Sequence, residues 1–444
     1  ILRTQNNWPY SKLIPNSGII SALTVCWLGI LAVAAQQSSV FKIGVLSDIH
    51  FMAPELLDKP GKAFDNYIIH DRKLLEQSPE LLDSAVHVLI QEQPEFIFIC
   101  GDLTKDGEKI SHRYVADHYL KQLRENGCRV FVVPGNHDVN NPHAVIFEGD
   151  TVRRTETVTP DEFARIYKDY GYGEALARDP HSLSYTARLD SHTWLLAIDA
   201  CKYEENDFDN NVCVTGGRIK PETMEFIRRQ VEEARRQHCR IVTMMHHGIV
   251  EHWKWQGKVM KDYLIDDWKS HAREFGKLGL RVVFTGHFHA QDITAFGKGN
   301  RCVYDVETGS TVSFPQPVRI VTCCYPELNI RTRCVEHLSG VNTLNELSIR
   351  YARSGIQTII SDMLPASIPY DIRQQAGSTL SKAYVAHLKG DEKMSDSYKS
   401  ELKKSCRSLR RYSWKYAFAL KVLGKSFFHD LTPADSDIVL KLNK

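Results

Sequence analysis

FIFICGDLT, residues 96–104, is the stretch of sequence that decides the fold. Its first five residues are branched or aromatic and apolar, which is typical of a buried strand in a sheet covered on both faces. Gly101 then lets the backbone turn sharply, and Asp102 places a carboxylate at the carboxyl end of the strand. Open α/β sheets bind their ligands at that end. A single aspartate at such a position more often caps the following helix, so the prediction of a site depends on recurrence of the pattern.

The same pattern, an apolar strand that runs into polar side chains, occurs five times in the chain. The predicted strands begin at residues 41, 96, 129, 241 and 281, and helix-like spacing occurs between them, as over 63–93 and 221–237. This alternation predicts an α/β fold with a layered core of roughly 290 residues. We expect the strand ends to converge on one sheet edge. The polar groups at these ends are Asp48-Ile49-His50, Gly101-Asp102, Gly135-Asn136-His137-Asp138, His246-His247 and Gly286-His287-Phe288-His289.

The donor atoms at these strand ends indicate a metal site. They are imidazole nitrogens, carboxylate oxygens and one amide oxygen, without a thiolate. Such a set suits Zn, Mn, Fe, Co or Ni as divalent or trivalent ions, whereas calcium prefers oxygen alone. His287 and His289 are two residues apart, and on an extended backbone both rings would point to the same face. Asp48 and His50 repeat that spacing, so each pair could serve two neighbouring metals.

In this order the five motifs resemble the signature of the calcineurin-like metallophosphoesterase superfamily, over about residues 41–335. The resemblance implies a four-layer α/β/β/α sandwich that holds two transition metal ions at the strand ends. The resemblance does not determine which metals bind, and Mn, Fe, Zn, Co and Ni are the candidates. By the family's motif, Asp48, His50 and His289 would bind one ion, Asn136, His246 and His287 would bind the other, and Asp102 would bridge both.

The resemblance also implies a mechanism of phosphoester hydrolysis. Two close metal ions neutralise phosphate charge and lower the pKa of a bridging water, whose hydroxide attacks phosphorus. His137 would assist the leaving group with a proton or hydrogen bond, and Asp138 would orient its ring, unless Asp138 caps a helix instead. We expect His246 rather than His247 as the ligand, because the family's ligand directly ends the strand.

We therefore expect an enzyme, a metal-dependent hydrolase whose substrate is a small-molecule or lipid-derived phosphodiester. A phosphomonoesterase is the first alternative. A non-catalytic metal-binding scaffold of the same fold is the second, although the chain keeps all seven ligand positions and His137. A nucleic acid substrate is disfavoured because the formal net charge of 444 residues is only +2. The oligomeric state and the substrate are not predicted.

The N-terminal residues have the layout of a secretory signal peptide. Residues 17–35 are apolar and uncharged, Lys12 precedes them, and Ala32-Val33-Ala34 forms a small-x-small cleavage pattern. We expect residues 1–35 to be removed on export to the periplasm or the medium, which leaves no stable membrane span. An uncleaved membrane anchor is the alternative. Among the cysteines, Cys201 and Cys213 are the favoured disulfide pair.

The predicted organisation is a metallophosphoesterase domain at 36–335 and a helical region at 336–444. Within the helical region, residues 391–425 contain ten Lys or Arg and four Asp or Glu, with aromatic residues interleaved. Such a stretch can bind polyanions. A helix with one solvated face is the favoured interpretation of this stretch.

Overall fold

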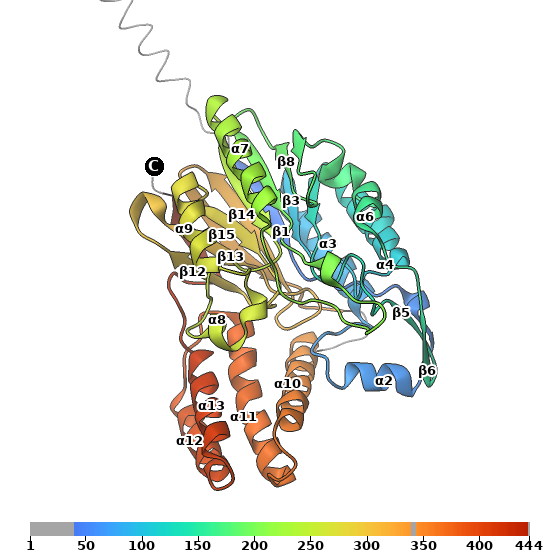
Figure 1. Ribbon diagram of the computed structural model, residues 1–444, viewed down its shortest axis with the longest axis vertical. Coiled ribbons are helices and arrows are strands. Elements are labelled where there is room, and N and C mark those ends of the chain that lie inside the picture. The colour runs from blue at the N-terminus through green and yellow to red at the C-terminus, as the bar shows by residue number, and fades with distance from the viewer. Residues whose placement is uncertain (1–39, 339–342, 443–444) are drawn as a thin grey trace, which may run out of the picture. The chain divides into compact units, whose positions relative to one another are not determined.

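The computed structural model describes residues 40–338 and 343–442. The predicted signal peptide, residues 1–35, lies outside these described residues. Three sheets form the framework, and two of them are large (Figure 1). The first has six strands in the order β16-β15-β14-β1-β3-β4. Its members are β1 (Phe41–Leu46), β3 (Phe96–Cys100), β4 (Arg129–Val133), β14 (Pro317–Cys324), β15 (Glu327–Cys334) and β16 (Ile438–Lys441).

The second sheet has seven strands in the order β12-β13-β11-β10-β9-β8-β7. Strands β9, β10, β11 and β13 run parallel to one another, as do β1, β3 and β4 in the first sheet. The parallel strands are almost wholly buried, which explains their continuous apolar sequences. The seven members are β7 (Ala177–Arg178), β8 (Tyr185–Arg188), β9 (Thr193–Ile198), β10 (Arg240–Met245), β11 (Val282–Thr285), β12 (Asp292–Phe296) and β13 (Val303–Glu307).

Helices cover the outer face of each large sheet, so the predicted four-layer α/β/β/α arrangement is confirmed. The apolar side of α3 (Ser78–Glu92) packs in the core of the six-stranded sheet. Helices α7 (Pro221–Arg236) and α9 (Trp268–Leu278) pack on the seven-stranded sheet. The inner faces of the two sheets meet, and the rings of Phe98 and Phe284 lie 6.0 Å apart between them. The strand predicted from residue 241 begins at Arg240, and the helix predicted over 221–237 ends at Arg236, so both form within a residue of expectation.

The predicted helical stretch 63–93 is interrupted. It contains α2 (Lys62–Ile68) and α3, joined by a loop over residues 69–77. In that loop Asp71 accepts hydrogen bonds from the amides of Arg72 and Lys73, so its side chain competes with helix formation. Helix α3 restarts with Pro79 in its first turn, a position that tolerates the missing amide hydrogen.

The segment between residues 140 and 190 has its own structure. A three-stranded sheet forms from β2 (Leu57–Lys59), β5 (Val145–Glu148) and β6 (Thr151–Arg154). Helix α6 (Pro160–Ile166) follows, and Thr159 and Glu162 cap it reciprocally. In the connection between β3 and β4, a short α-helical segment, α4 (Lys109–Tyr114), continues through a π-helical turn into α5 (Lys121–Glu125).

The C-terminal residues are mainly helical, as expected, but they end in a strand. Four helices, α10 (Leu344–Met363), α11 (Tyr370–Lys389), α12 (Asp396–Arg410) and α13 (Trp414–Ser426), precede β16. Strand β16 then pairs antiparallel with β15, so the chain returns to complete the six-stranded sheet. Among the described residues, no helix has the length and apolar character needed to cross a membrane.

The disulfide predicted between Cys201 and Cys213 is wrong. Both thiols are free, as are the other eight cysteines among the described residues. Cys201 Sγ lies 3.4 Å from the carbonyl oxygen of Pro134, and Cys213 Sγ lies 3.5 Å from that of Asn136. Both cysteines therefore pack under the loop that carries Asn136 and His137.

Candidate metal centre

The five predicted strand ends meet where the carboxyl ends of both large sheets face each other. Strands β1, β3 and β4 are parallel neighbours, and β10 and β11 are parallel neighbours in the other sheet. The loops that follow these five strands carry the polar motifs. As a result, all seven predicted metal ligands are buried and lie near one another.

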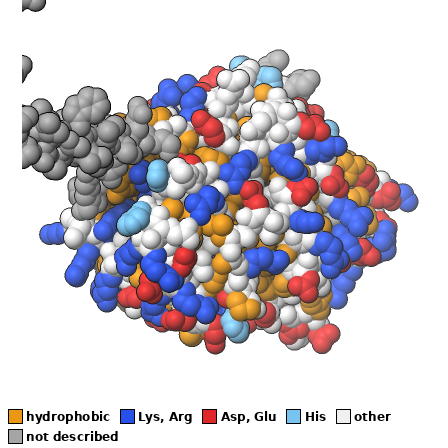
Figure 2. All heavy atoms as spheres, turned by 90° about the horizontal axis from the view of Figure 1, so that it is seen from above, with side chains coloured by type: hydrophobic (Ala, Val, Ile, Leu, Met, Phe, Trp, Pro, Cys, Tyr) orange, Lys and Arg blue, Asp and Glu red, His pale blue; other side chains and the backbone are white. Residues whose placement is uncertain are grey.

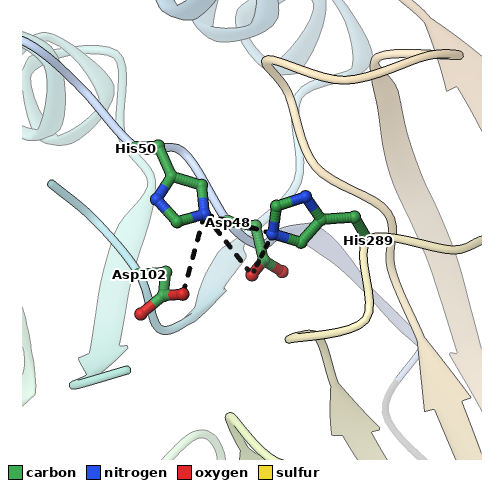
Figure 3. A group of neighbouring side chains, drawn as sticks. All are labelled: Asp48, His50, Asp102 and His289. Carbon is green, nitrogen blue, oxygen red and sulfur yellow. Dashed lines mark hydrogen bonds and ion pairs between the residues drawn. The ribbon is translucent and has the colours of Figure 1, made fainter. Parts of the chain in front are cut away.

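One group comprises Asp48, His50, Asp102 and His289 (Figure 3). Each offers one ligand atom, and these atoms all lie within 4.8 Å of one another. His50 Nε2 lies 3.1 Å from His289 Nε2 and 3.6 Å from Asp102 Oδ2. His289 Nε2 lies 3.3 Å from Asp48 Oδ1. In Figure 3 the two rings and the two carboxylates turn toward a common centre.

A second group comprises Asp102, His246 and His287, whose ligand atoms also lie within 4.8 Å of one another. His246 Nε2 is 3.3 Å from Asp102 Oδ2 and 3.2 Å from Asn136 Oδ1. The carboxylate of Asp102 therefore belongs to both groups. This is the geometry expected of a residue that bridges two metal ions.

Unusual backbone conformations bring these side chains together. Asp48, His50, Asp102, His287 and His289 have φ angles of 51°, 43°, 50°, 80° and 70°. Residues other than glycine rarely adopt this left-handed region, and strained residues of this kind cluster at functional sites. We expected the two-residue spacing to act through an extended backbone, and that expectation is wrong. Left-handed turns, rather than a pleated strand, aim the paired side chains at one centre.

Two motif glycines are required by close approach of neighbouring side chains. A Cβ atom on Gly135 would lie 2.3 Å from the backbone nitrogen of Asp102 and would collide with its carboxylate. A Cβ on Gly286 would collide with the side chains of Ser47 and Asp48. The candidate ligands from different strands can approach one another only because these two positions lack side chains.

The residues present fit a pair of metal ions. Asp48 Oδ1 is buried and has no hydrogen-bond partner among the described residues, although buried carboxylate oxygens are rarely left unpaired. The other oxygen, Oδ2, accepts from Ser47 Oγ at 2.6 Å and from the amide of His287 at 2.9 Å. A cation beside Oδ1 would satisfy it. The set of nitrogen and oxygen donors suits transition metals.

Contacts outside the centre fix which ring nitrogen of each histidine faces inward. His246 Nδ1 lies 2.7 Å from the carbonyl oxygen of Cys100, which leaves Nε2 for the centre. His287 Nε2 lies 3.0 Å from the carbonyl oxygen of Asp262, which leaves Nδ1. Carbonyl oxygens can only accept, so these outer nitrogens carry the hydrogens. Such contacts orient metal-binding histidines in proteins generally.

For three of the four candidate histidines, the electrostatics of the centre favour the neutral state that metal binding needs. The exception is His246: burial acts to lower its pKa, but the charge of Asp102 outweighs burial and raises the pKa to about 9. Burial lowers the pKa of His50, His287 and His289 below the ordinary value, so these rings stay neutral and keep a lone pair. Burial acts to raise the pKa of Asp102, but the positive charges of His246 and His137 outweigh it and the pKa is lowered well below its usual value. Asp102 is therefore a carboxylate.

His137 lies beside the centre and is partly accessible, with 26% of its side chain exposed. Its ring stands edge-on to that of His50, with 4.8 Å between centroids. Nδ1 lies 2.8 Å from the carbonyl oxygen of Lys105 and 2.9 Å from Asp106 Oδ1. Nδ1 therefore carries the hydrogen, and Nε2 is the nitrogen that can meet a ligand.

The residue expected to orient His137, Asp138, points elsewhere. Its carboxylate accepts hydrogen bonds from the amides of Gly135, Leu103 and Thr104 and from the hydroxyl of Thr104, at 2.8–3.1 Å. Asp138 thus ties the loop after β3 to the loop after β4. Asp106 takes the place beside the ring of His137 that we had assigned to Asp138.

Sequence reasoning missed Asp106 and its buried neighbours. Asp106 Oδ2 accepts from Tyr67 Oη at 2.9 Å and from Lys105 Nζ at 2.5 Å. Lys105 is fully buried and also contacts Glu108 Oε1 at 2.9 Å. In the sequence Asp106-Gly107 is typical of a turn. Lys105 and Glu108 flank this turn, in a loop that follows a strand end with a candidate ligand. These flanking charges were the signal in the sequence that could have pointed to Asp106.

His247 lies outside both groups of candidate ligands. Its Nε2 lies 3.0 Å from the carbonyl oxygen of Thr215, and its ring packs on that of His287 at 4.4 Å between centroids. His247 therefore supports the orientation of a candidate ligand.

The segment His252-Trp253-Lys254-Trp255, which follows the His246-His247 motif, divides between core and surface. His252 and Trp253 are buried. Trp253 packs on Phe427 of the helical region, and His252 lies among three carboxylates, those of Asp292, Asp305 and Glu307, at 2.9–3.4 Å. Trp253 therefore joins the sandwich to the C-terminal helical region, whereas His252 lies against the strands of the sandwich.

Comparison with known proteins identifies the family. A family model described as calcineurin-like phosphoesterase matches residues 41–291, more than half of the chain. The chain therefore belongs to the calcineurin-like phosphoesterase family. It is 34% identical over 76 residues to a probable cyclic nucleotide phosphodiesterase of Coxiella burnetii. That match covers 16% of this chain and 29% of the relative's own length.

Two solved structures align with this chain at low sequence identity. A dimetal phosphatase from Danio rerio aligns with 67% of this chain and 97% of its own, at 12% identity and a TM-score of 0.46. A purple acid phosphatase from yellow lupin (Lupinus luteus) seeds aligns with 69% of this chain and 53% of its own, at 13% identity and a TM-score of 0.42.

Proposed function

We propose that this protein is a metal-dependent hydrolase of phosphoester bonds that works with two transition metal ions. The observation that carries the proposal is the position of Asp102, whose carboxylate belongs to two buried groups of ligand atoms at once. One ion would be held by Asp48, His50 and His289, and the other by Asn136, His246 and His287. The unpartnered Asp48 Oδ1 supports the first of these sites.

The protein's own residues divide the remaining work. A bound metal pair supplies Lewis acidity toward the phosphoryl group and generates the nucleophile from water. The side chain of His137 is partly accessible beside the centre, and its Nε2 can transfer a proton to the oxygen of the leaving group. Asp106 and the carbonyl of Lys105 hold Nδ1–H, which keeps the ring in place for that transfer. The buried contact of Lys105 with Asp106 fixes the carboxylate in turn.

For the substrate class we propose a phosphodiester of a small molecule or a lipid. The name of the Coxiella burnetii relative supports a diester and makes cyclic nucleotides the first compounds to test. A phosphomonoester is the second candidate, because the same two-metal chemistry acts on both classes. Lys73 is buried beside the centre, and its positive charge acts on His50, His137 and His289, so it can attract the anionic phosphoryl group.

The test is an activity panel on metal-stripped protein. Cyclic nucleotides, bis(p-nitrophenyl) phosphate, glycerophosphodiesters and phosphomonoesters would be assayed after addition of Mn, Fe, Zn, Co or Ni. We expect metal-dependent hydrolysis, with diesters hydrolysed faster than monoesters. Hydrolysis that is faster for monoesters would reassign the substrate class. No hydrolysis of any ester by protein that has rebound two metals would support the non-catalytic scaffold instead.

We also propose that the protein is exported. The apolar, uncharged residues 17–35 and the Ala32-Val33-Ala34 pattern support a cleaved signal peptide. The proposal concerns the sequence alone, since these positions lie outside the described residues.

A further inference from the structure

A groove of about 710 Å³ runs between helices α12 and α13, on the C-terminal helical region. Its residues come from one face of each helix. On α12 they recur at intervals of three and four residues, and the same holds on α13, so each helix presents one continuous stripe to the groove. The lining comprises Met394, Lys399, Leu402, Lys403, Cys406, Arg407, Arg410, Trp414, Ala417, Phe418, Lys421 and Lys425.

The groove has an apolar floor and a basic rim. Leu402 and Ala417 are buried at its base. Six of the twelve lining residues are Lys or Arg, and none is acidic. The acidic residues of α12 lie off this face, and Glu401 pairs with Lys382 of α11 at 2.6 Å. By contrast, the face of the molecule seen in Figure 2 carries basic and acidic side chains interspersed.

The basic rim is largely without counter-charges. Lys399 pairs with Asp396 at 2.9 Å. The other five cations make no ion pair within 4.0 Å with any residue of the part of the chain that the structure describes; they are Lys403, Arg407, Arg410, Lys421 and Lys425. Like charges at this density on two adjacent helix faces repel one another, which favours an anionic partner.

Exposed apolar side chains continue from the groove to the nearby turns. Trp414 is 66% exposed and Phe418 is 62% exposed, although both are large and apolar. Tyr412 at the turn between α12 and α13 is 51% exposed, and Met363 and Tyr370 at the turn between α10 and α11 are 71% and 67% exposed. Figure 1 shows both turns at the lower end of the helical region.

We propose that the α12–α13 groove and these turns form a docking surface for an anionic phospholipid bilayer. Basic residues near an anionic leaflet are attracted to its headgroups, and amphipathic aromatic side chains favour the interface between headgroups and acyl chains. Trp414 and Phe418 enter the interface while the lysines and arginines of the rim contact headgroup phosphates. The docking surface makes the protein a peripheral membrane protein, and it is independent of the hydrolase activity proposed above.

Two other occupants fit the groove less well. The apolar residues 17–35 of this chain would suit its floor, but residues 1–39 carry Arg3 and Lys12 and no acidic residue, so charge opposes that contact. A single-stranded nucleic acid could stack on the aromatics. The floor, however, offers aliphatic Met394, Leu402 and Ala417, which suit an acyl chain and give a base edge no hydrogen-bond partner.

The test is sedimentation of the full-length protein with two kinds of vesicle. One contains phosphatidylcholine alone, and the other also contains roughly 40% phosphatidylglycerol, so that its surface is anionic enough to attract basic residues. Wild-type protein is expected to bind the anionic vesicles and to lose binding as salt rises. The variant Lys403→Gln/Arg407→Gln should bind roughly 25-fold more weakly, since each basic residue contributes about fivefold at an anionic surface. Its control, Arg229→Gln/Lys298→Gln, has the same net charge and should bind nearly as the wild type.

Aromatic insertion is tested separately. Trp414→Ser/Phe418→Ser should bind anionic vesicles more weakly at every salt concentration, whereas Trp255→Ser/Val259→Ser, an exposed apolar pair on another surface, should not. Thermal melting verifies that each variant is folded. Equal binding to neutral and anionic vesicles, equal losses in the groove and control pairs, or groove-dependent binding of single-stranded oligonucleotide in preference to vesicles would each overturn the proposal.

Discussion

At the scale of single residues, the centre depends on how each histidine is held from outside. Carbonyl oxygens of Cys100 and Asp262 fix His246 and His287, and Asp106 fixes His137. The first two contacts orient rings that we assign to metal binding. The third orients a ring that we assign to proton transfer. These roles predict different consequences for substitution.

His137→Ala should remove proton transfer without removing metal. Because the ring is not assigned as a ligand, the variant should retain both ions and the fold. General acid catalysis contributes typically ~10²–10⁴-fold, so kcat should fall within that range for an alkyl phosphodiester. The loss should be much smaller for a p-nitrophenyl ester, whose leaving group needs little protonation. Equal losses for both substrates, or loss of metal, would contradict the assignment.

Asp106→Asn should show part of the substrate-dependent loss expected for His137→Ala. The reason is that Asp106 positions His137 and touches no reacting atom in the proposed scheme. We expect a reduced kcat for the alkyl ester, a smaller effect on the p-nitrophenyl ester and unchanged metal content. In the double variant with His137→Ala the second substitution should add almost nothing, since both act through one ring. Tyr67→Phe, which removes one hydrogen bond to Asp106, is the matched control and should have a smaller effect.

At the scale of elements, buried charged residues join the strands of the sandwich to the segment that precedes β16. His252, in the loop after β10, lies among carboxylates from β12 and β13. Nearby, Asp435 accepts hydrogen bonds from the amides of Ile293 and Asp391, and Arg319 donates to the carbonyl oxygen of Asp435. These contacts attach residues that precede β16 to the strands of both large sheets.

His252→Ala should therefore destabilise the fold. Removing one partner of a buried charge cluster costs about 3–5 kcal/mol, because the remaining charges stay buried without compensation. Burial lowers the pKa of His252, but the charges of Asp305, Asp292 and Glu307 outweigh it and raise the pKa well above 6.5. The stabilisation is thus fully present below about pH 6.5 and is lost as the pH rises through the folded-state pKa.

Chemical denaturation of wild type and His252→Ala at several pH values checks this. The difference in unfolding free energy between wild type and His252→Ala should be largest below about pH 6.5. It should shrink as the pH rises through the folded-state pKa of His252. His192→Ala, at an exposed histidine, is the control and should leave stability unchanged. A difference that grows with pH would contradict the assigned charge of His252.

At the scale of the whole molecule, the strand ends were predictable and the supporting contacts were not. The five motifs could be found because each lies within a few residues of its own strand, and parallel order then brings them together. Asp106 was missed because its partner His137 is 31 residues away and reached through a turn. Asp138 was misassigned because its proximity to His137 in sequence does not determine where its carboxylate points. The left-handed residues and the returning strand β16 likewise depend on distant packing.

Export is a property of the whole chain and can be tested directly. Expressed in a host with a secretion system, the mature protein should begin near Ala35 or Gln36, because a signal peptidase cuts after the small-x-small pattern. N-terminal sequencing of purified soluble protein checks this. Soluble protein that keeps residues 1–30 would show that the apolar stretch is not a cleaved signal.

The central claim is that Asp102 bridges two metal ions in one centre. Elemental analysis of purified active protein, combined with the variant Asp102→Ala, tests that claim most directly. We predict two transition metal ions per wild-type chain, a lower metal content in Asp102→Ala and no detectable hydrolysis by the variant. The variant should lose affinity at both sites, since one carboxylate serves both ions. Active wild-type protein without a transition metal, or an Asp102→Ala variant with two metals and full activity, would contradict the account.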